Sequence, residues 1–229
     1  MTRRERNETL KQALARAART TFANVNSEEE EELTKLSTQR PDDLELIKDG
    51  SRSKVGAYRL ASGRKVTLKY YYPTNIAKKI RNRIVGSHCK RSWIAAHGFA
   101  YLKIPTPQPL AVAEFHSLGL INSMSFLATD YIEGIQLRFL EQDRYKAIAP
   151  ALKSALQTMA EHHVAHGDLK NTNIIVNSRN EIAFIDLDDT RFNLQGYTWK
   201  RARNYDQYRF QKNWRDNPIA ASILNDCIA

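Results

Sequence analysis

Cysteine is nearly absent from this chain: Cys89 and Cys227 are its two cysteines in 229 residues, and they stand far apart. Neither belongs to a Cys-x-x-Cys pair, so the sequence offers no disulfide framework and no zinc knuckle, and it fits a reducing compartment. No apolar run approaches the ~18 residues of a membrane-spanning helix. The basic stretch at residues 1–6 is not followed by the apolar core of a secretory signal. We therefore expect a soluble, cytoplasmic chain.

Acidic residues are outnumbered, with 25 Asp and Glu against 35 Lys and Arg, which gives a formal net charge of +10. Such an excess favours a polyanionic partner, namely a nucleic acid, an anionic lipid or a phosphorylated substrate. The shortage is most marked between Tyr70 and Ala113, where no Asp or Glu occurs and the cations are Lys78, Lys79, Arg81, Arg83, Lys90, Arg91 and Lys103.

The first 48 residues are predicted to form a helical extension. Ser27 is expected to cap a helix whose acidic first turns, residues 28–32, favour the positive end of the helix dipole and lie in solvent. Before it, apolar residues recur at helical spacing at Leu10, Leu14 and Ala17.

Strands are predicted next, because short apolar runs alternate with turn residues. The first three are antiparallel and cover residues 44–47, 55–60 and 65–70. Within the third, Val66, Leu68 and Tyr70 share one face, while Thr67 and Lys69 share the other. Two further strands are expected at residues 110–115 and 125–132.

Helical patterns fill most of the remaining chain. A helix over residues 74–103 is expected to break at Gly86-Ser87 and to end at the proline-rich segment 104–109. Its expected buried positions are Ile80, Ile84, Trp93, Ile94 and Leu102. A later helix is indicated by Tyr145, Ile148, Leu152, Leu156 and Met159. Short strands at 173–176 and 182–185 and a basic, aromatic helix near 202–214 follow.

One short segment carries the strongest chemical signal. His166, Asp168 and Asn173 have the His-x-Asp-x-x-x-x-Asn spacing of a kinase catalytic loop. This spacing lets one loop bring Asp168 to an acceptor hydroxyl and turn Asn173 towards a magnesium ion. Asp186, at the end of an apolar strand, supplies a second oxygen ligand of the kind that Mg²⁺ prefers. Each residue alone is more often a turn, cap or structural residue, but the joint pattern arises by chance in roughly one chain in a thousand.

The expected ATP site draws on the strand lysine. A lysine such as Lys69, pointing into a cleft from a strand, can pair with the α- and β-phosphates of ATP. The turn between the first two strands would cover the phosphates with backbone N–H groups, although it lacks a full G-x-G-x-x-G. The predicted ATP-binding set is Lys69, Gly50, Ser51, Ser53, Thr67, Asp130 and Ile132. Lys170 is expected to neutralise charge on the transferred phosphoryl group, and His166 and Asp188 are accessory candidates.

With these residues assembled, the chain resembles the lipopolysaccharide core kinase family, the Kdo and heptose kinases of Gram-negative envelopes. The similarity extends over about residues 45–215. The Ile-Pro-Thr-Pro-x-Pro-Leu-Ala stretch and the Ile-Asp-Leu-Asp motif are the more particular to this family. The residues that carry the resemblance are 50–55, 69–71, 104–111, 125–134, 167–173 and 185–188.

The resemblance implies a protein-kinase-like, two-lobed α+β fold. Its parts would be the helical extension over 1–48, a small antiparallel-sheet N-lobe with a basic helix over 49–133, and a truncated, mainly helical C-lobe over 134–229. It further implies ATP- and Mg²⁺-dependent phosphorylation of a sugar hydroxyl in the lipopolysaccharide inner core. The partner is then a lipid A-core acceptor rather than nucleic acid, met at the cytoplasmic face of the inner membrane, where the basic helix can contact anionic lipid.

Two departures keep alternatives open. The usual partner of the strand lysine is a Glu on the first long helix, and the acid-free stretch between Tyr70 and Ala113 contains none. Asp-Phe-Gly is replaced by Asp186-Leu187-Asp188, and only 43 residues follow Asp186, too few for the peptide-docking helices of a protein kinase. The alternatives are a minimal atypical protein kinase or ATPase of a nucleic-acid-linked complex, and a pseudokinase scaffold.

Overall fold

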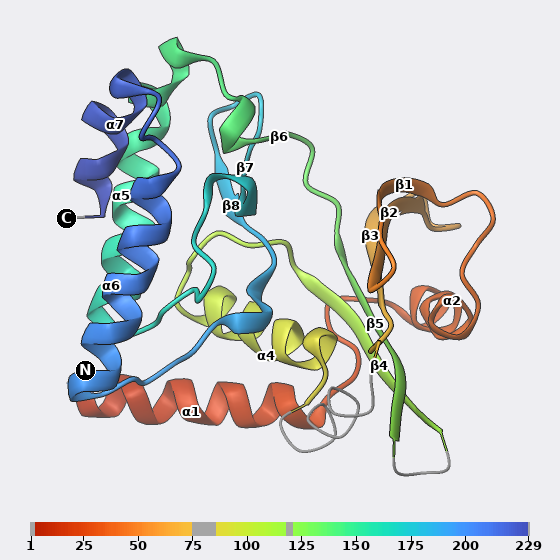
Figure 1. Cartoon of the computed structure of the whole chain (residues 1–229). Helices are drawn as coiled ribbons and strands as arrows, with labels where there is room; N and C mark the ends of the chain where they lie inside the picture. Colours follow the sequence, from red (N-terminus) through yellow and green to blue (C-terminus); the bar gives the residue numbers. More distant parts are fainter. Residues whose placement is uncertain (1–2, 75–85, 118–120, 229) are drawn as a thin grey trace. The chain divides into compact units, whose positions relative to one another are not determined.

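The computed structural model describes residues 3–74, 86–117 and 121–228, and the chain divides into two compact units (Figure 1). The sheet unit comprises residues 12–97 and 107–131. The helical unit comprises residues 1–11, 98–106 and 132–229. An antiparallel sheet dominates one unit and helices dominate the other, so the predicted α+β, two-lobed class is confirmed.

The elements lie close to the predicted ones. The helices are α1 (Arg3–Arg19), α2 (Ser27–Thr38), α4 (His88–Tyr101), α5 (Tyr145–Glu161), α6 (Gly196–Lys212) and α7 (Pro218–Leu224). The strands are β1 (Glu45–Asp49), β2 (Ser53–Arg59), β3 (Lys65–Tyr71), β4 (Pro109–Ser117), β5 (Ile121–Asp130), β6 (Ile135–Gln136), β7 (Ile174–Val176) and β8 (Ile182–Phe184).

The sheet unit is built on five antiparallel strands in the order β1-β2-β3-β5-β4. The predicted alternation in β3 is confirmed, since Val66, Leu68 and Tyr70 are buried on one face. They pack there against Leu33 and Leu36 of α2, and the Tyr70 hydroxyl donates to the Leu36 carbonyl at 2.8 Å. Apolar burial on this face therefore fixes which side of β3 faces away from α2.

The opposite face of the sheet packs against helices α1 and α4. Trp93 of α4 and Ala17 of α1 contact Tyr71 and Leu127 there, and the Trp93 ring N–H donates to the Ala17 carbonyl at 2.8 Å. Directly paired residues on neighbouring strands share a face, and Lys69 pairs with Leu127. Lys69 therefore lies on this second face, as its alternation with the buried residues predicts.

The expected N-terminal extension over 1–48 does not form a unit of its own. Residues 1–11 belong to the helical unit and the rest to the sheet unit, because α2 buries its leucines against the sheet. The expected cap at Ser27 is wrong. Asn26 is the N-cap: its side chain accepts the Glu29 N–H at 2.9 Å, and the Glu29 carboxylate accepts the Asn26 N–H at 3.4 Å.

The acidic start of α2 is also less solvated than predicted. Glu29 is buried and bonds to the Ser62 hydroxyl at 2.8 Å and to Arg64 at 3.2 Å. Although burial opposes it, these partners and the Asn26 N–H hold the pKa of Glu29 below its usual range. The carboxylate therefore ties α2 to the β2–β3 turn.

The helix predicted over 74–103 is confirmed from His88 to Tyr101, and Ile80 and Ile84 lie outside the described residues. Trp93 is buried as predicted, whereas Ile94 and Leu102 are half-buried. The basic helix predicted near 202–214 begins earlier, at Gly196. The structure describes no helix long and apolar enough to cross a membrane.

The helical unit places α5, α6 and α7 beside the three-stranded sheet β6-β7-β8 (Figure 1). The five apolar positions predicted for α5 are all buried. The proline-rich stretch covers the open edge of β8: the Pro105 carbonyl accepts the Phe184 N–H at 2.9 Å, and the Thr106 hydroxyl donates to the Phe184 carbonyl at 2.9 Å. This stretch therefore fixes the strand that leads into Ile185 and Asp186.

Candidate active site

The predicted catalytic loop begins at a short backbone bridge. Ala165 and Arg191 exchange both N–H···O bonds, at 2.9 and 2.8 Å. Gly167 then takes a φ of +83°, and a Cβ at this position would lie 2.3 Å from the Asp189 carbonyl oxygen. Only glycine meets both requirements, so the loop and the turn after Asp186 approach each other closely here.

His166 is a structural element of this loop. It is fully buried, and burial lowers the pKa of its ring, which is therefore neutral. Its Nε2 lies 3.2 Å from the Ile185 carbonyl and its Nδ1 lies 3.4 Å from the Asp168 N–H. These partners fit the tautomer with the proton on Nε2. The ring thus links the loop to the strand before Asp186, and an accessory role of His166 in catalysis stays a prediction.

Asp206 of α6 binds the backbone of the loop. Its carboxylate accepts the backbone N–H of His166 at 2.7 Å and that of Gly167 at 3.0 Å, and Leu169 donates a third backbone bond. The side chain is buried. Burial raises the pKa of Asp206 to about 6, even though the three N–H bonds act in the opposite direction. One carboxylate therefore satisfies three backbone N–H donors of the loop.

Asp168, the predicted base, is held by cations on both carboxylate oxygens. Oδ2 accepts from Lys170 Nζ at 2.6 Å and from Asn173 Nδ2 at 3.2 Å, while Oδ1 accepts from the Arg209 guanidinium of α6. Burial opposes the shift, yet Lys170 and Arg209 keep the pKa of Asp168 below its usual range. Asp168 is therefore an ionised acceptor at neutral pH.

Asn173 and Asp186 fit the predicted Mg²⁺ site by their chemistry. Asn173 uses its Nδ2 as a donor to Asp168, so its amide oxygen is the atom suited to a cation. Asp186 is exposed, with a left-handed backbone of φ +61°, and the Ile185 N–H before it donates to the Asn173 carbonyl at 2.9 Å. Within the described residues no cluster of three or more His, Cys, Asp or Glu could hold a metal. Two oxygen ligands suit Mg²⁺, which keeps water and phosphate in its remaining positions. Asp188 follows in a single 3₁₀ turn (Leu187–Asp189).

The predicted phosphate-covering loop lies in the sheet unit between β1 and β2. The Gly50 N–H donates to the Ser53 carbonyl at 3.0 Å, Ser51 is exposed, and Ser53 is buried at the start of β2. Gly56 serves packing, because a Cβ there would lie 2.5 Å from Leu44 Cγ. The loop is thus a tight hairpin, and its role towards ATP stays a prediction.

The predicted strand lysine lies on the face of the sheet that meets α4. Thr67 and Lys69 are half-exposed on β3, and the Cys89 thiol donates to the Lys69 carbonyl at 3.9 Å. Glu114 is the first carboxylate after the acid-free stretch, and the register places it on the same face, two strands away, opposite Ser125. Its Oε1 accepts the Ser87 N–H at 2.8 Å, at the start of α4. Glu114 therefore anchors this helix to the sheet.

Two residues of the predicted ATP-binding set, Asp130 and Ile132, lie at the end of β5 and just after it. The Asp130 N–H donates to the Gln108 carbonyl at 2.9 Å, and its carboxylate bonds to Arg64 Nε at 2.7 Å. This contact raises the pKa of Arg64. Ile132 follows two residues later, as the first residue of the next segment of the helical unit. Their contact with a nucleotide also stays a prediction.

The basic helix predicted to face a membrane is only partly described, since Lys78, Lys79, Arg81 and Arg83 lie outside the described residues. Lys90 donates to the Thr20 carbonyl at 3.1 Å, and burial lowers its pKa. Arg91 donates to the Gly86 carbonyl at 2.8 Å. These two cations therefore bond to backbone carbonyls of the fold.

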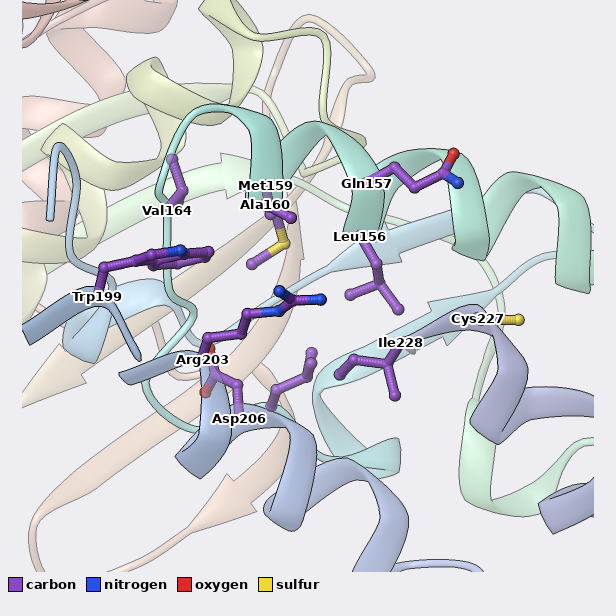
Figure 2. A pocket seen from close by; sticks show the side chains of 11 residues that line it. Leu156, Gln157, Met159, Ala160, Val164, Trp199, Arg203, Asp206, Cys227 and Ile228 are labelled. Carbon is purple, nitrogen blue, oxygen red and sulfur yellow. The ribbon is translucent and has the colours of Figure 1, made fainter. Parts of the chain in front are cut away.

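A small cavity of about 60 Å³ lies in the helical unit, between α5 and α6, with Leu169 of the loop in its lining. Figure 2 shows Trp199, Arg203 and Asp206 of α6 facing Leu156 and Met159 of α5 across it. Its lining is mainly apolar and includes none of Asp168, Asn173 or Asp186. The cavity is therefore separate from the predicted catalytic carboxylates.

Two residues of the site, Asp206 and Arg209, have no place in the sequence motifs. Asp206 gave a usable signal: it is the single acid in the basic stretch 196–212, and it is spaced four residues from Ala202 and from Phe210. An acid on the apolar stripe of a helix indicates a buried, bonded carboxylate. Arg209 gave none, because no spacing rule connects a helix cation with a loop 41 residues away.

Comparison with known proteins agrees with this geometry. No curated protein matches the chain. The profile of the lipopolysaccharide kinase (Kdo/WaaP) family matches residues 48–221, a span that includes the loop at 166–173 as well as Lys69, Asp186 and Arg209. Because this match covers most of the chain, the chain belongs to the lipopolysaccharide kinase (Kdo/WaaP) family and is a phosphotransferase with a kinase-like fold.

Proposed function

We propose that this kinase transfers the γ-phosphoryl group of ATP to a sugar hydroxyl, on Kdo or heptose, in the lipopolysaccharide inner core. The observation that carries the proposal is the arrangement around Asp168: an ionised carboxylate bonded to Lys170 and Asn173, and connected to Asp186 through the Asn173–Ile185 backbone bond. Family membership supports a lipopolysaccharide acceptor.

In this proposal Asp168 orients the acceptor hydroxyl and accepts its hydrogen. A bond forms between the acceptor oxygen and the γ-phosphorus, and the bond from that phosphorus to the bridging oxygen of ADP breaks, with its electron pair leaving on ADP. The proton passes to Asp168 and then to solvent. Lys170 neutralises charge on the transferred group, and Lys69 binds the α- and β-phosphates.

Asn173 and Asp186 would hold Mg²⁺ through their side-chain oxygens. When bound, the ion neutralises charge on the phosphate oxygens. The chain's own part is to fix these two ligands, which it does through the Asn173–Ile185 backbone bond and the left-handed turn at Asp186.

We place the reaction at the cytoplasmic face of the inner membrane, where ATP is available and the lipid-linked acceptor is exposed. Exposed cations support this location, because each Lys or Arg close to an anionic bilayer contributes about 1 kcal/mol. Lys200, Arg201 and Lys212 of α6 are exposed.

A transfer assay with radiolabelled ATP tests the proposal. Purified enzyme is offered a Kdo-containing lipid A glycolipid, the same glycolipid extended with heptose, and casein as a protein acceptor. We expect label on one of the two glycolipids, none on casein, and none on any acceptor with the Asp168→Asn variant. Label on casein alone would contradict the proposal in favour of a protein kinase, and tight ATP binding without transfer to any acceptor would indicate a pseudokinase.

A further inference from the structure

Two cations surround the carboxylate of Asp168, although one would suffice to keep it ionised. Lys170 and Arg209 both pair with it, so these three groups together have a net charge of +1. A base paired with two cations is a weak proton acceptor. The acceptor hydroxyl must come within about 2.6–3.2 Å of the same carboxylate. The site is therefore matched to an acceptor that brings negative charge with it.

Lys170 and Arg209 differ in how they are attached. Lys170 belongs to the catalytic loop, two residues from the base. Arg209 comes from α6, and the loop backbone is held by its neighbour Asp206 instead. Arg209 can therefore exchange partners without disturbing the loop. Its planar guanidinium binds a carboxylate or phosphate through two parallel bonds, which Lys cannot do.

The exposed face of α6 around Arg209 is suited to an anionic saccharide. Tyr205 and Tyr208 are 47% and 49% exposed, and the Arg209 guanidinium lies 6.0 Å from the Tyr205 ring centre. Lys212 and Arg215 lie 6.0 and 5.7 Å from the Tyr208 ring centre. Flat aromatic faces pack against the C–H faces of sugar rings, and the adjacent cations can bind acidic groups on those sugars. These two tyrosines and three cations form a cluster that begins next to Asp168 and continues along α6 to Arg215, just after its end.

We propose, on the basis of the function proposed above, that Arg209 determines acceptor specificity by binding an anionic group next to the hydroxyl that is phosphorylated. In the acceptor-free chain Arg209 neutralises Asp168. A carboxylate or phosphate on the acceptor takes over the guanidinium, and Oδ1 of Asp168 then accepts the hydroxyl hydrogen. The transfer itself is balanced as described above, so Arg209 binds substrate but exchanges no proton.

The test compares acceptors as well as variants. Wild type, Arg209→Gln and Arg209→Lys are assayed with a Kdo-containing lipid A glycolipid, with the same glycolipid after reduction of its carboxylates to alcohols, and with the phosphatase-treated glycolipid. The control variant is Arg179→Gln, which removes an exposed arginine that pairs with Glu181. Thermal melts confirm that each variant is folded.

For the wild type we expect kcat/KM to fall about 10- to 100-fold on one of the two modified glycolipids, as for the loss of a hydrogen bond to a charged group, and the affected glycolipid identifies carboxylate or phosphate as the source. Arg209→Gln should lose about as much on the intact glycolipid and show no further loss on the modified one. Arg209→Lys should recover part of the activity, and Arg179→Gln should behave as wild type.

Two results would overturn the inference while leaving the proposed function in place. One is a wild type that uses all three glycolipids equally well. The other is an Arg209→Gln variant that discriminates among them as strongly as the wild type. If the wild type labels no glycolipid at all, the proposed function fails, and the role of Arg209 fails with it.

Discussion

The two units hold their predicted functional residues by different means. In the helical unit the predicted catalytic loop is fixed by buried polar groups: Asp206 binds its backbone, and His166 and Asn173 connect it to Ile185. In the sheet unit Lys69 lies on β3, which strand register and the apolar packing of the sheet hold in place. We therefore expect single polar substitutions in the helical unit to disturb both the loop and the transfer step, whereas apolar substitutions in the sheet unit should act through the packing that holds β3.

The largest effect is expected on kcat, for a substitution of the predicted base Asp168, and the KM for ATP distinguishes it from a substitution of Lys69. Asp168→Asn keeps the size of the side chain but removes the ionised acceptor, so kcat should fall about 10³-fold while affinity for ATP is retained. Lys69→Met should instead raise the KM for ATP, because it removes the proposed partner of the α- and β-phosphates. Steady-state kinetics with nucleotide titrations measure both. Near-normal turnover in Asp168→Asn would sink the assignment of the base.

Asp206→Ala tests whether one carboxylate fixes the loop. It leaves the backbone donors of His166 and Gly167 without their partner, and buried unsatisfied donors cost about 1–3 kcal/mol each. We expect the free energy of unfolding at pH 7 to fall by about 3 kcal/mol and kcat to fall with it. Denaturant melts measure the first quantity, and the exposed Asp226→Ala variant is the control.

The pH dependence of the free energy of unfolding, compared between wild type and Asp206→Ala, tests the raised pKa of Asp206. The folded-state pKa of Asp206 is raised from 3.8 to about 6, so the native state holds the proton more tightly than the unfolded chain. The part of its stabilisation that comes from proton uptake is therefore complete below about pH 4 and is lost as the pH rises through about 6, whereas its bonds to the backbone N–H groups remain at pH 7. The stability difference between wild type and Asp206→Ala should be larger at pH 4.5 than at pH 7.5, by about 2 kcal/mol. A difference that grows with pH would contradict the raised pKa.

The smallest effect is expected for packing in the sheet unit. Gly56→Ala would bring a Cβ to 2.5 Å from Leu44 Cγ and 2.8 Å from the Glu45 carbonyl, and such overpacking costs about 1–3 kcal/mol. Gly63→Ala is the matched control: it has open space but a φ of +85°, which costs about 1 kcal/mol. Melting temperatures of the two variants measure the difference. A Gly56→Ala variant that is more stable than Gly63→Ala would show that Leu44 moves away freely.

Sequence patterns predicted the parts of the fold that depend on local periodicity. The alternation in β3 and the apolar stripe of α5 are both confirmed, because burial on one face acts on every second, third or fourth residue. The cap of α2 was misassigned by one residue, since Asn26 and Ser27 are both good caps and the reciprocal bond with Glu29 decides between them. Local patterns indicated the helices within 1–48, but not that these residues divide between the two units, because the packing of α2 on the sheet is a long-range contact.

The candidate site shows the same division. The motif placed Asp168, Lys170 and Asn173 in one loop, and the structure brings these three side chains into contact. Arg209 could not be predicted, because the contact depends on how α6 packs. The proline-rich stretch was recognised as a family feature, but its bonds to Phe184 could be seen only in three dimensions.

The mass of the lipopolysaccharide core tests the central claim most directly. Cores are isolated from cells with the gene, from cells without it, and from cells that carry only the Asp168→Asn form. A phosphotransferase that acts on a core sugar predicts a loss of one phosphate, about 80 Da, in both mutant strains, with fragment ions that assign the phosphate to Kdo or heptose. Identical core masses in all three strains would contradict the account.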